Sequence, residues 1–200
     1  MPHLLPWLES LPAGPLYVAI GLLAAVENVF PPVPADTVVA FGAFLAGRGV
    51  LDPWGVFAVT WTGNVAAAML VYGVGRRYGR AFFEGRLGRR LLSAQAMAHI
   101  EEAYARNGGR GIFVSRLLPV WRAVVPPFAG IARVPPGRAL VPIALASGLW
   151  YGLLTYLVTT LGTNLEAVTR AIARVNIVLG VAAAILVVIF GIWTYRRLKR

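Results

Sequence analysis

Residues Glu27 to Asp36 constrain the fold most, because they place two carboxylates and three prolines beside a long apolar segment. The segment Leu16 to Val29 is apolar apart from Glu27 and Asn28. The run Pro31 to Pro34 breaks any helix, since proline lacks an amide donor and clashes with the preceding turn. An acidic residue costs about 2.5–3.5 kcal/mol at mid-bilayer, and a broken helix there exposes backbone groups that lipid cannot satisfy. A stretch that carries both costs is a candidate functional site.

The composition predicts a polytopic membrane protein. The chain has 200 residues, of which 58% are hydrophobic and 14% charged, and its mean hydropathy is +0.69. These values are too apolar for an ordinary soluble domain, and the length favours one compact membrane domain over residues 1–200. The sequence contains no cysteine, which excludes disulfides and thiolate metal sites.

The positive charge follows the pattern of a membrane protein and does not indicate nucleic-acid binding. The net charge is +11, but the basic residues flank apolar segments. Eight arginines lie between Arg76 and Arg110, and the chain ends in Arg-Arg-Leu-Lys-Arg. Cytoplasmic loops of membrane proteins carry such an excess of basic residues. We therefore expect a membrane partner and no nucleic acid.

Two pairs of short apolar arms predict re-entrant hairpins. Gly14 to Phe30 would be about 25 Å long as a helix and Asp36 to Gly47 about 18 Å, whereas a bilayer core is about 30 Å thick. Two short tilted helices that cross completely remain the alternative for this first hairpin. A second apolar stretch, broken by Pro126 and Pro127, resembles the first with the sign of its charges reversed.

The predicted fold is an all-α membrane protein with three full transmembrane helices and two opposed re-entrant hairpins in an inverted repeat. Trp54, Trp61 and Tyr72 suit the membrane interfaces of the first full helix. An amphipathic cytoplasmic helix is expected over 93–106. The segments are hairpin 1 at 15–47, helix 53–75, the basic cytoplasmic segment 76–110, hairpin 2 at 111–134, helices 138–162 and 176–195, and the basic tail 196–200.

The charge distribution also predicts the topology. If segment 76–110 and the tail 196–200 are cytoplasmic, three full crossings place the amino terminus outside and the carboxyl terminus in the cytoplasm. The first hairpin then enters from outside and the second from the cytoplasm. Transport sites tend to lie at the interface of such inverted repeats, where discontinuous helices meet.

Four charged residues in the broken stretches are the candidate site: Glu27, Asp36, Arg116 and Arg122. Arginine stays charged and forks onto phosphate oxygens, so the two arginines are predicted to bind an anionic headgroup. Burial favours the protonated form of a carboxylate, so the two acids are predicted to carry protons. The alternative is that the four charges only hold the hairpins together through salt bridges.

Three polar residues are weaker candidates that would support this site: Asn28, Asn64 and Tyr72. Buried polar groups in membrane bundles more often pin helices together. We expect no catalytic residue, cofactor or metal, because neither histidine, His3 or His99, lies in an apolar segment near the arginines. A lipid phosphatase would need a histidine nucleophile or a metal cluster, so an enzyme is not expected.

The motifs resemble the DedA family, also called SNARE-associated or VTT-type membrane proteins. The resemblance runs from about Glu27 to Gly162, and its most specific part is an Arg-x5-Arg segment followed by Ala-Gly. Family members often have Gly-Asp where Gly63-Asn64 stands. The matching stretches are Glu27 with Pro31 to Pro34 and Asp36, Gly63-Asn64 with Tyr72, Gly75-Arg76 and Gly79, Phe113 to Arg122 with Ala129-Gly130, and Ser147 to Trp150.

The resemblance implies a multi-pass protein of a bacterial or archaeal inner membrane that transports or flips a lipid. Undecaprenyl phosphate or a phospholipid would be the cargo, and the proton-motive force would drive it. The two acids and two arginines would then be the functionally sensitive positions. A proton-coupled antiporter of a small ion or solute, and a structural or assembly protein, remain the alternatives. A homo-oligomer also stays open.

Overall fold

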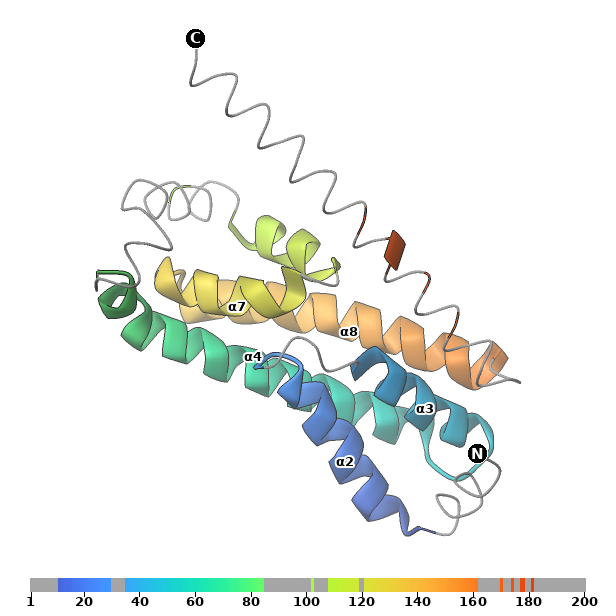
Figure 1. Ribbon diagram of the computed structural model, residues 1–200. Helices are drawn as coiled ribbons and strands as arrows, with labels where there is room; N and C mark the ends of the chain where they lie inside the picture. Colours follow the sequence, from blue (N-terminus) through green and yellow to red (C-terminus); the bar gives the residue numbers. More distant parts are fainter. Residues whose placement is uncertain are drawn as a thin grey trace.

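The computed structural model describes residues 11–29, 35–84, 108–118 and 121–161, together with positions 102, 170, 174, 177, 178 and 181. All regular secondary structure within these ranges is helical (Figure 1). A short helix covers 108–116. The labelled helices are α2 (Ala13–Val26), α3 (Ala35–Gly47), α4 (Pro53–Glu84), α7 (Trp121–Ile131) and α8 (Pro136–Leu161).

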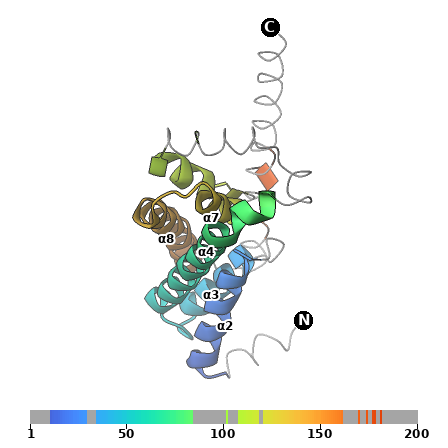
Figure 2. The ribbon, with the colours of Figure 1, turned by 90° about the vertical axis from the view of Figure 1, so that its left-hand side faces the viewer.

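The two long helices, α4 and α8, lie antiparallel at the centre of the bundle (Figures 1 and 2). Near the middle of α4, Trp61 Nε1 donates a hydrogen bond of 2.9 Å to the carbonyl of Ala144. Further along α4, Tyr72 Oη donates one of 2.5 Å to the carbonyl of Val134, just before α8 begins. The shorter helices pack around this central pair.

The described elements repeat once along the chain. Helices α2, α3 and α4 are followed by the 108–116 helix, α7 and α8, so each half has two short helices and one long helix. The second short helix of each half packs against the long helix of the other half: α3 lies on α8, and α7 lies on α4. This exchange brings the starts of α3 and α7 to the middle of the bundle.

The same cap ends α3 and α7. After α3, Gly49 has φ 79°, and the amides of Gly49 and Val50 donate to the carbonyls of Ala46 and Leu45. After α7, Arg133 has φ 54°, and the amides of Arg133 and Val134 donate to Gly130 and Ala129. Both are Schellman caps, which usually place glycine at the left-handed position. The two turns lead directly into α4 and α8.

Glycines let the helices approach closely. A methyl group on Gly75 would collide with the carbonyl of Pro127, and one on Gly130 would collide with the carbonyl of Tyr72. Gly63 meets the backbone of α2 at Gly21 in the same way. Small residues at such contacts allow backbone-to-backbone packing, which is typical of membrane helices. A methyl group on Gly79 would collide with the side chain of Ile131, whereas nothing lies within 4 Å of the same position at Gly73.

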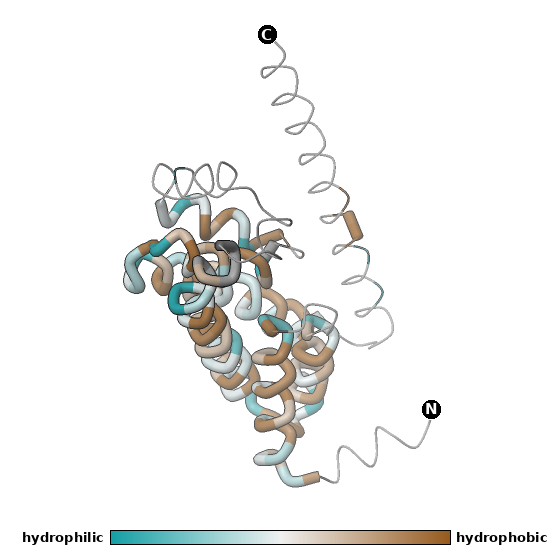
Figure 3. Tube along the Cα trace, turned by 60° about the vertical axis from the view of Figure 1, so that its left-hand side comes forward, coloured by the Kyte–Doolittle hydropathy of each residue, from teal (hydrophilic) through white to brown (hydrophobic). Residues whose placement is uncertain are grey.

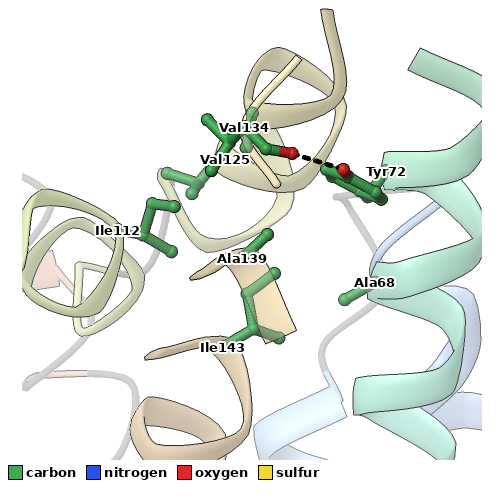
Figure 4. Packing of buried hydrophobic residues seen from close by; sticks show 8 residues of the cluster. Ala68, Tyr72, Ile112, Val125, Val134, Ala139 and Ile143 are labelled. Carbon is green, nitrogen blue, oxygen red and sulfur yellow. Dashed lines mark hydrogen bonds between the residues drawn. The ribbon is translucent and has the colours of Figure 1, made fainter. Parts of the chain in front are cut away.

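A hydrophobic cluster joins α4, α7, α8 and the 108–116 helix at one end of the bundle (Figure 4). Tyr72 belongs to it, with its ring buried among the aliphatic side chains and its hydroxyl turned to Val134. The buried members are Ala68, Tyr72, Ile112, Val125, Ala129, Val134, Ala139 and Ile143.

The outer faces of the helices are apolar, as a membrane protein requires. Two helical stretches, Pro53–Gly79 and Pro136–Thr160, are long and apolar enough to cross a membrane. Large hydrophobic side chains stand exposed on α2, α4 and α8, including Leu22, Leu70 and Leu153. Hydrophobic residues accordingly recur along the length of these helices (Figure 3). Exposed apolar surface on this scale is unusual for a soluble monomer.

Three sequence expectations about helix ends need correction. Helix 53–75 continues to Glu84, because Gly75 is a packing contact and not a terminator. The first arm ends at Val26, before Glu27 and well before the prolines. Pro126 and Pro127 lie inside α7, so the second apolar stretch breaks earlier, after the turn at Leu117.

Two of the three aromatic residues predicted at the membrane interfaces are not exposed side chains. Tyr72 is buried, and Trp61 is half-buried and donates a hydrogen bond to the backbone of α8. Only Trp54 of the three is fully exposed.

Helix 138–162 is confirmed within two residues by α8. The predicted helices 93–106 and 176–195 lie almost entirely outside the described residues.

We expect Gly75→Ala to destabilise the bundle, because the added methyl forces α7 away from α4. Overpacking of this kind costs about 1–3 kcal/mol. Thermal unfolding of the detergent-solubilised protein measures the effect. Gly73→Ala is the matched control on the same helix, and it should be neutral or slightly stabilising because alanine is the better helix former. Equal effects of the two substitutions would contradict the close packing.

Candidate functional site

The four predicted charges meet at the centre of the bundle. Glu27 caps the end of α2, and Arg116 is the last residue of the 108–116 helix. Asp36 and Arg122 are each the second residue of their helices, α3 and α7. The breaks in the two halves therefore deliver four charges to one place, beside the middle turns of α4 and α8.

Arg122 contacts both carboxylates. Its Nη1 and Nη2 donate hydrogen bonds of 2.9 Å and 2.6 Å to the two oxygens of Asp36, a bidentate pair. Its Nε lies 2.8 Å from Oε1 of Glu27, close enough for an ion pair but without hydrogen-bond geometry. Bidentate Arg–carboxylate pairs are among the strongest hydrogen-bonded pairs in proteins. Arg122 thus joins α7 to both arms of the first half.

Asp36 has a second donor on α8. Trp150 Nε1 donates a hydrogen bond of 2.9 Å to Oδ1 of Asp36, and the guanidinium carbon of Arg122 lies 5.7 Å from the centroid of the Trp150 ring. Asp36 also lies in the first turn of α3, where the helix dipole favours a negative charge. The position is therefore built to hold an anion.

Arg116 is held differently, by neutral groups. Its Nη2 donates to Oδ1 of Asn64 at 2.8 Å and to Oγ of Ser147 at 3.1 Å. Its Nη1 donates to the backbone carbonyl of Arg122 at 2.9 Å. That carbonyl needs a donor from elsewhere because Pro126, four residues later, has no amide hydrogen. The proline inside α7 therefore creates the acceptor that holds Arg116.

A hydrogen-bonded chain connects Glu27 to the same asparagine. Tyr151 Oη donates to Oε2 of Glu27 at 2.9 Å and accepts from Nδ2 of Asn64 at 3.1 Å. The same Nδ2 lies 3.3 Å from the carbonyl of Ala24, at the end of α2. Asn64 therefore uses both the nitrogen and the oxygen of its side-chain amide. Asn28 Nδ2 donates a hydrogen bond of 3.2 Å to the backbone carbonyl of Asn64.

The site is almost fully buried and electrically balanced. Glu27, Asp36 and Arg116 are 5%, 2% and 5% exposed, and the Arg122 side chain is 12% exposed. Two acids offset two arginines, so the cluster carries no net charge when all four are ionised. Buried charges are tolerated when they are paired and hydrogen-bonded. The four predicted residues are therefore in direct or bridged contact, an arrangement that also holds the two halves together.

Of the three supporting candidates, the structure brings Asn28 and Asn64 into the site. Tyr72 lies outside it, because its hydroxyl bonds to Val134 and accepts from Arg76 at 2.7 Å. Sequence reasoning gave no role to three residues of α8 that contact the charges: Ser147, Trp150 and Tyr151. Trp150 and Tyr151 follow Ser147 by three and four residues, which places all three on one helix face. This spacing was the sequence feature that could have identified them as a group.

One groove of the bundle lies apart from these residues. A mostly apolar groove of about 310 Å³ lies between the start of α4 and the end of α8, and none of the predicted site residues lines it. In the ranges that the structure describes, no group of three or more His, Cys, Asp or Glu side chains could hold a metal ion.

The fold and site define a helical membrane protein with a buried, charge-balanced network at its centre. The model of the VTT domain matches residues 33–160, and the chain belongs to this family, the DedA family. The match confirms the resemblance seen in the motifs. No solved structure matches the chain.

Similar proteins cover nearly the whole chain. An alkaline phosphatase-like protein of Lactococcus lactis subsp. cremoris is 30% identical over 179 residues, covering 87% of this chain and 82% of the relative. The undecaprenyl phosphate transporter A of Bacillus subtilis is 27% identical over 189 residues, covering 94% and 91%. An uncharacterized membrane protein of Mycobacterium tuberculosis is 29% identical over 188 residues, covering 90% and 86%.

We expect Asn64→Leu to be strongly destabilising, because it removes the acceptor of Arg116 and the donor of Tyr151 while keeping a similar volume. Each buried polar group left without a partner costs about 1–3 kcal/mol. Asn28→Leu is the matched control, since the side chain of Asn28 is equally buried but makes one described hydrogen bond. Chemical or thermal unfolding of both variants checks the order. A larger loss for Asn28→Leu would contradict the central role of Asn64.

Proposed function

We propose that this protein transports an anionic lipid, such as undecaprenyl phosphate or a phospholipid, across the membrane, with Arg122 binding the phosphate. One observation carries the proposal: Arg122 presents a bidentate fork to a buried carboxylate. The same fork matches two oxygens of a phosphate. The similarity to a protein described as an undecaprenyl phosphate transporter supports a lipid-linked phosphate as the cargo.

In this proposal Asp36 and the phosphate compete for Arg122. The described arrangement is the state without cargo, in which Asp36 neutralises Arg122 and Trp150 gives Asp36 a neutral donor. When phosphate takes the fork, Asp36 loses its cation but keeps the indole hydrogen bond. Two anions at one arginine would repel each other in a dry site, so the exchange requires that Asp36 or Glu27 becomes neutral.

Protonation of a carboxylate supplies that neutral state and couples transport to the proton gradient. A protonated Asp36 can no longer form a full ion pair, which releases Arg122 for the phosphate. When the phosphate leaves, the proton leaves and the ion pair returns. Glu27 sits on the other side of Arg122, at 2.8 Å, and the Tyr151 hydroxyl is its hydrogen-bond donor. It is the second candidate for the proton.

Arg116 takes a different part. Neutral acceptors hold it, so it does not lose a carboxylate partner when the phosphate arrives. Arg116 donates a hydrogen bond to the backbone carbonyl of Arg122, and this contact keeps its positive charge near the guanidinium of Arg122. We infer that Arg116 provides a fixed positive potential while Arg122 exchanges partners.

The membrane arrangement belongs to the same proposal. Hairpins 15–47 and 111–134 enter from opposite faces, three helices cross fully, the amino terminus lies outside and the carboxyl terminus lies in the cytoplasm. Access to the central charges then alternates between the two faces around a fixed site, as in other transporters built from repeats.

We expect Arg122→Lys to lower the transport rate by at least about tenfold, because an ammonium cannot make two parallel bonds to phosphate. Purified protein in vesicles is the system, and movement of a fluorescent polyprenyl phosphate between leaflets is the readout. Arg48→Lys is the control, since Arg48 lies at the far end of α3. If folded Arg122→Lys protein transports at the normal rate, Arg122 is not the phosphate fork.

The same vesicles separate transport from a purely architectural role. Replacing both members of the pair, as Asp36→Asn with Arg122→Gln, removes one buried charge of each sign and leaves Glu27 and Arg116 to offset each other. Such paired replacements are often tolerated in stability. A folded double variant without lipid movement supports the transport role. A folded double variant with normal lipid movement assigns the charges to architecture, and proton-linked movement of a soluble ion without lipid assigns the protein to the antiporters.

Glu27→Gln tests the proton step. If Glu27 carries the proton, transport by this variant becomes independent of an imposed pH gradient, because glutamine cannot be protonated in this range. Lipid movement is measured with and without the gradient, beside the unmodified protein. Transport that still responds to the gradient removes Glu27 from the role, and Asp36→Asn is then the variant that should lose the response.

A further inference from the structure

A second group of positive charges lies at the end of the bundle where α4 finishes and α8 begins, away from the central site (Figure 1). It is separated from Asn64 by three turns of α4, about 18 Å from Asn64 to Arg76 at the helical rise. We call it the arginine collar. It consists of Arg76, Arg77, Arg110, Arg133 and Arg138, all of them exposed.

Backbone contacts place these arginines together. Arg76 Nη1 donates a hydrogen bond of 3.0 Å to the carbonyl of Val134, next to Arg133. A methyl group on Gly109, beside Arg110, would lie 3.7 Å from the carbonyl of Arg138. Four separate segments thus contribute to one edge: α4, the 108–116 helix, the turn after α7 and the first turn of α8.

Arg133 occupies a backbone position that suits glycine. Its φ of 54° is the left-handed conformation, and it is the one positive φ of a non-glycine residue in the described ranges. The equivalent cap after α3 carries Gly49, with φ 79°. A side chain is disfavoured in this conformation, and such outliers point to function when the surroundings hold them. The turn after α7 therefore keeps a long cationic side chain at a local cost in stability.

The neighbours of the collar indicate the kind of partner. Val74 and Tyr78 on α4, and Leu140 and Val141 on α8, are large, exposed and apolar. They stand within a turn of Arg77 and Arg138. Among the described residues, the side chains of Arg110, Arg133 and Arg138 form no hydrogen bond or ion pair. Cationic forks beside exposed apolar side chains match a lipid, which offers a charged headgroup above hydrocarbon.

We propose that the arginine collar binds the phosphate headgroups of anionic membrane lipids, with Arg133 held in its strained turn for that purpose. The guanidinium groups bind phosphate oxygens, and the apolar side chains of α4 and α8 contact the acyl chains. The collar binds lipids of the surrounding leaflet and does not require the transport role of the central charges.

Native mass spectrometry of the purified protein with equal amounts of phosphatidylglycerol and phosphatidylcholine tests the collar. The variant with Arg77, Arg110, Arg133 and Arg138 all changed to Gln should lose at least about tenfold in preference for phosphatidylglycerol, since each arginine near the surface contributes to the attraction. Arg48→Gln, at the opposite end of the bundle, is the control and should retain it. Unchanged preference in the fourfold variant overturns the proposal, and so does a short oligonucleotide that binds more tightly than phosphatidylglycerol.

Arg133→Gly should change thermal stability and lipid retention in opposite directions. It should raise the midpoint of thermal unfolding, because glycine relieves the left-handed strain, and it should weaken retention of phosphatidylglycerol. A lower midpoint with normal lipid retention overturns the role of Arg133. Movement of the fluorescent polyprenyl phosphate is measured on the fourfold variant as well. Lost phosphatidylglycerol preference with normal lipid movement supports the collar alone, so failure of the transport proposal and failure of the collar proposal give different results.

Discussion

The structure depends on the ion pairs that Arg122 makes with two carboxylates from the other half of the chain. Three buried charges would be untenable one at a time, and each is tolerated only because the others are present. The bidentate contact to Asp36 and the contact to Glu27 tie α7 to the broken first hairpin. Tyr151 links Glu27 to α8, and Asn64 and Ser147 hold Arg116 beside the two long helices. The centre of this bundle is thus polar, and its outside is apolar.

Close packing at small residues and the hydrogen bonding of buried polar groups together make the buried charges possible. Gly63 and Gly75 bring the backbone of α4 against its neighbours, which places the charged breaks within hydrogen-bond distance of the middle turns. Pro126 then frees a carbonyl of α7, and Arg116 uses it. A residue usually regarded as a helix breaker therefore serves here as a means of holding a buried cation.

The sequence alone was sufficient to single out the four charged residues that meet at the centre of the bundle, because an acid or arginine in an apolar run has few explanations. It was also sufficient for the all-helical class and for the limits of α3 and α8 within two residues. It failed at Gly75 and Pro126, where local propensity suggests a break but the helix continues because of its tertiary contacts. It gave no role to Trp150 and Tyr151, since an aromatic residue in a membrane helix looks like ordinary packing until its partner is known.

The repeated halves carry opposite signs at matching places. Asp36 and Arg122 are both the second residue of a short helix, and Asn64 and Ser147 both lie eleven residues after the first residue of a long helix. If either half were to pair with a copy of itself, like charges would meet in a dry interior. The sequence therefore discourages self-association of each half during folding and favours the native partner. The opposite charges of the two halves therefore select which segments assemble, in addition to any part they take in moving a ligand.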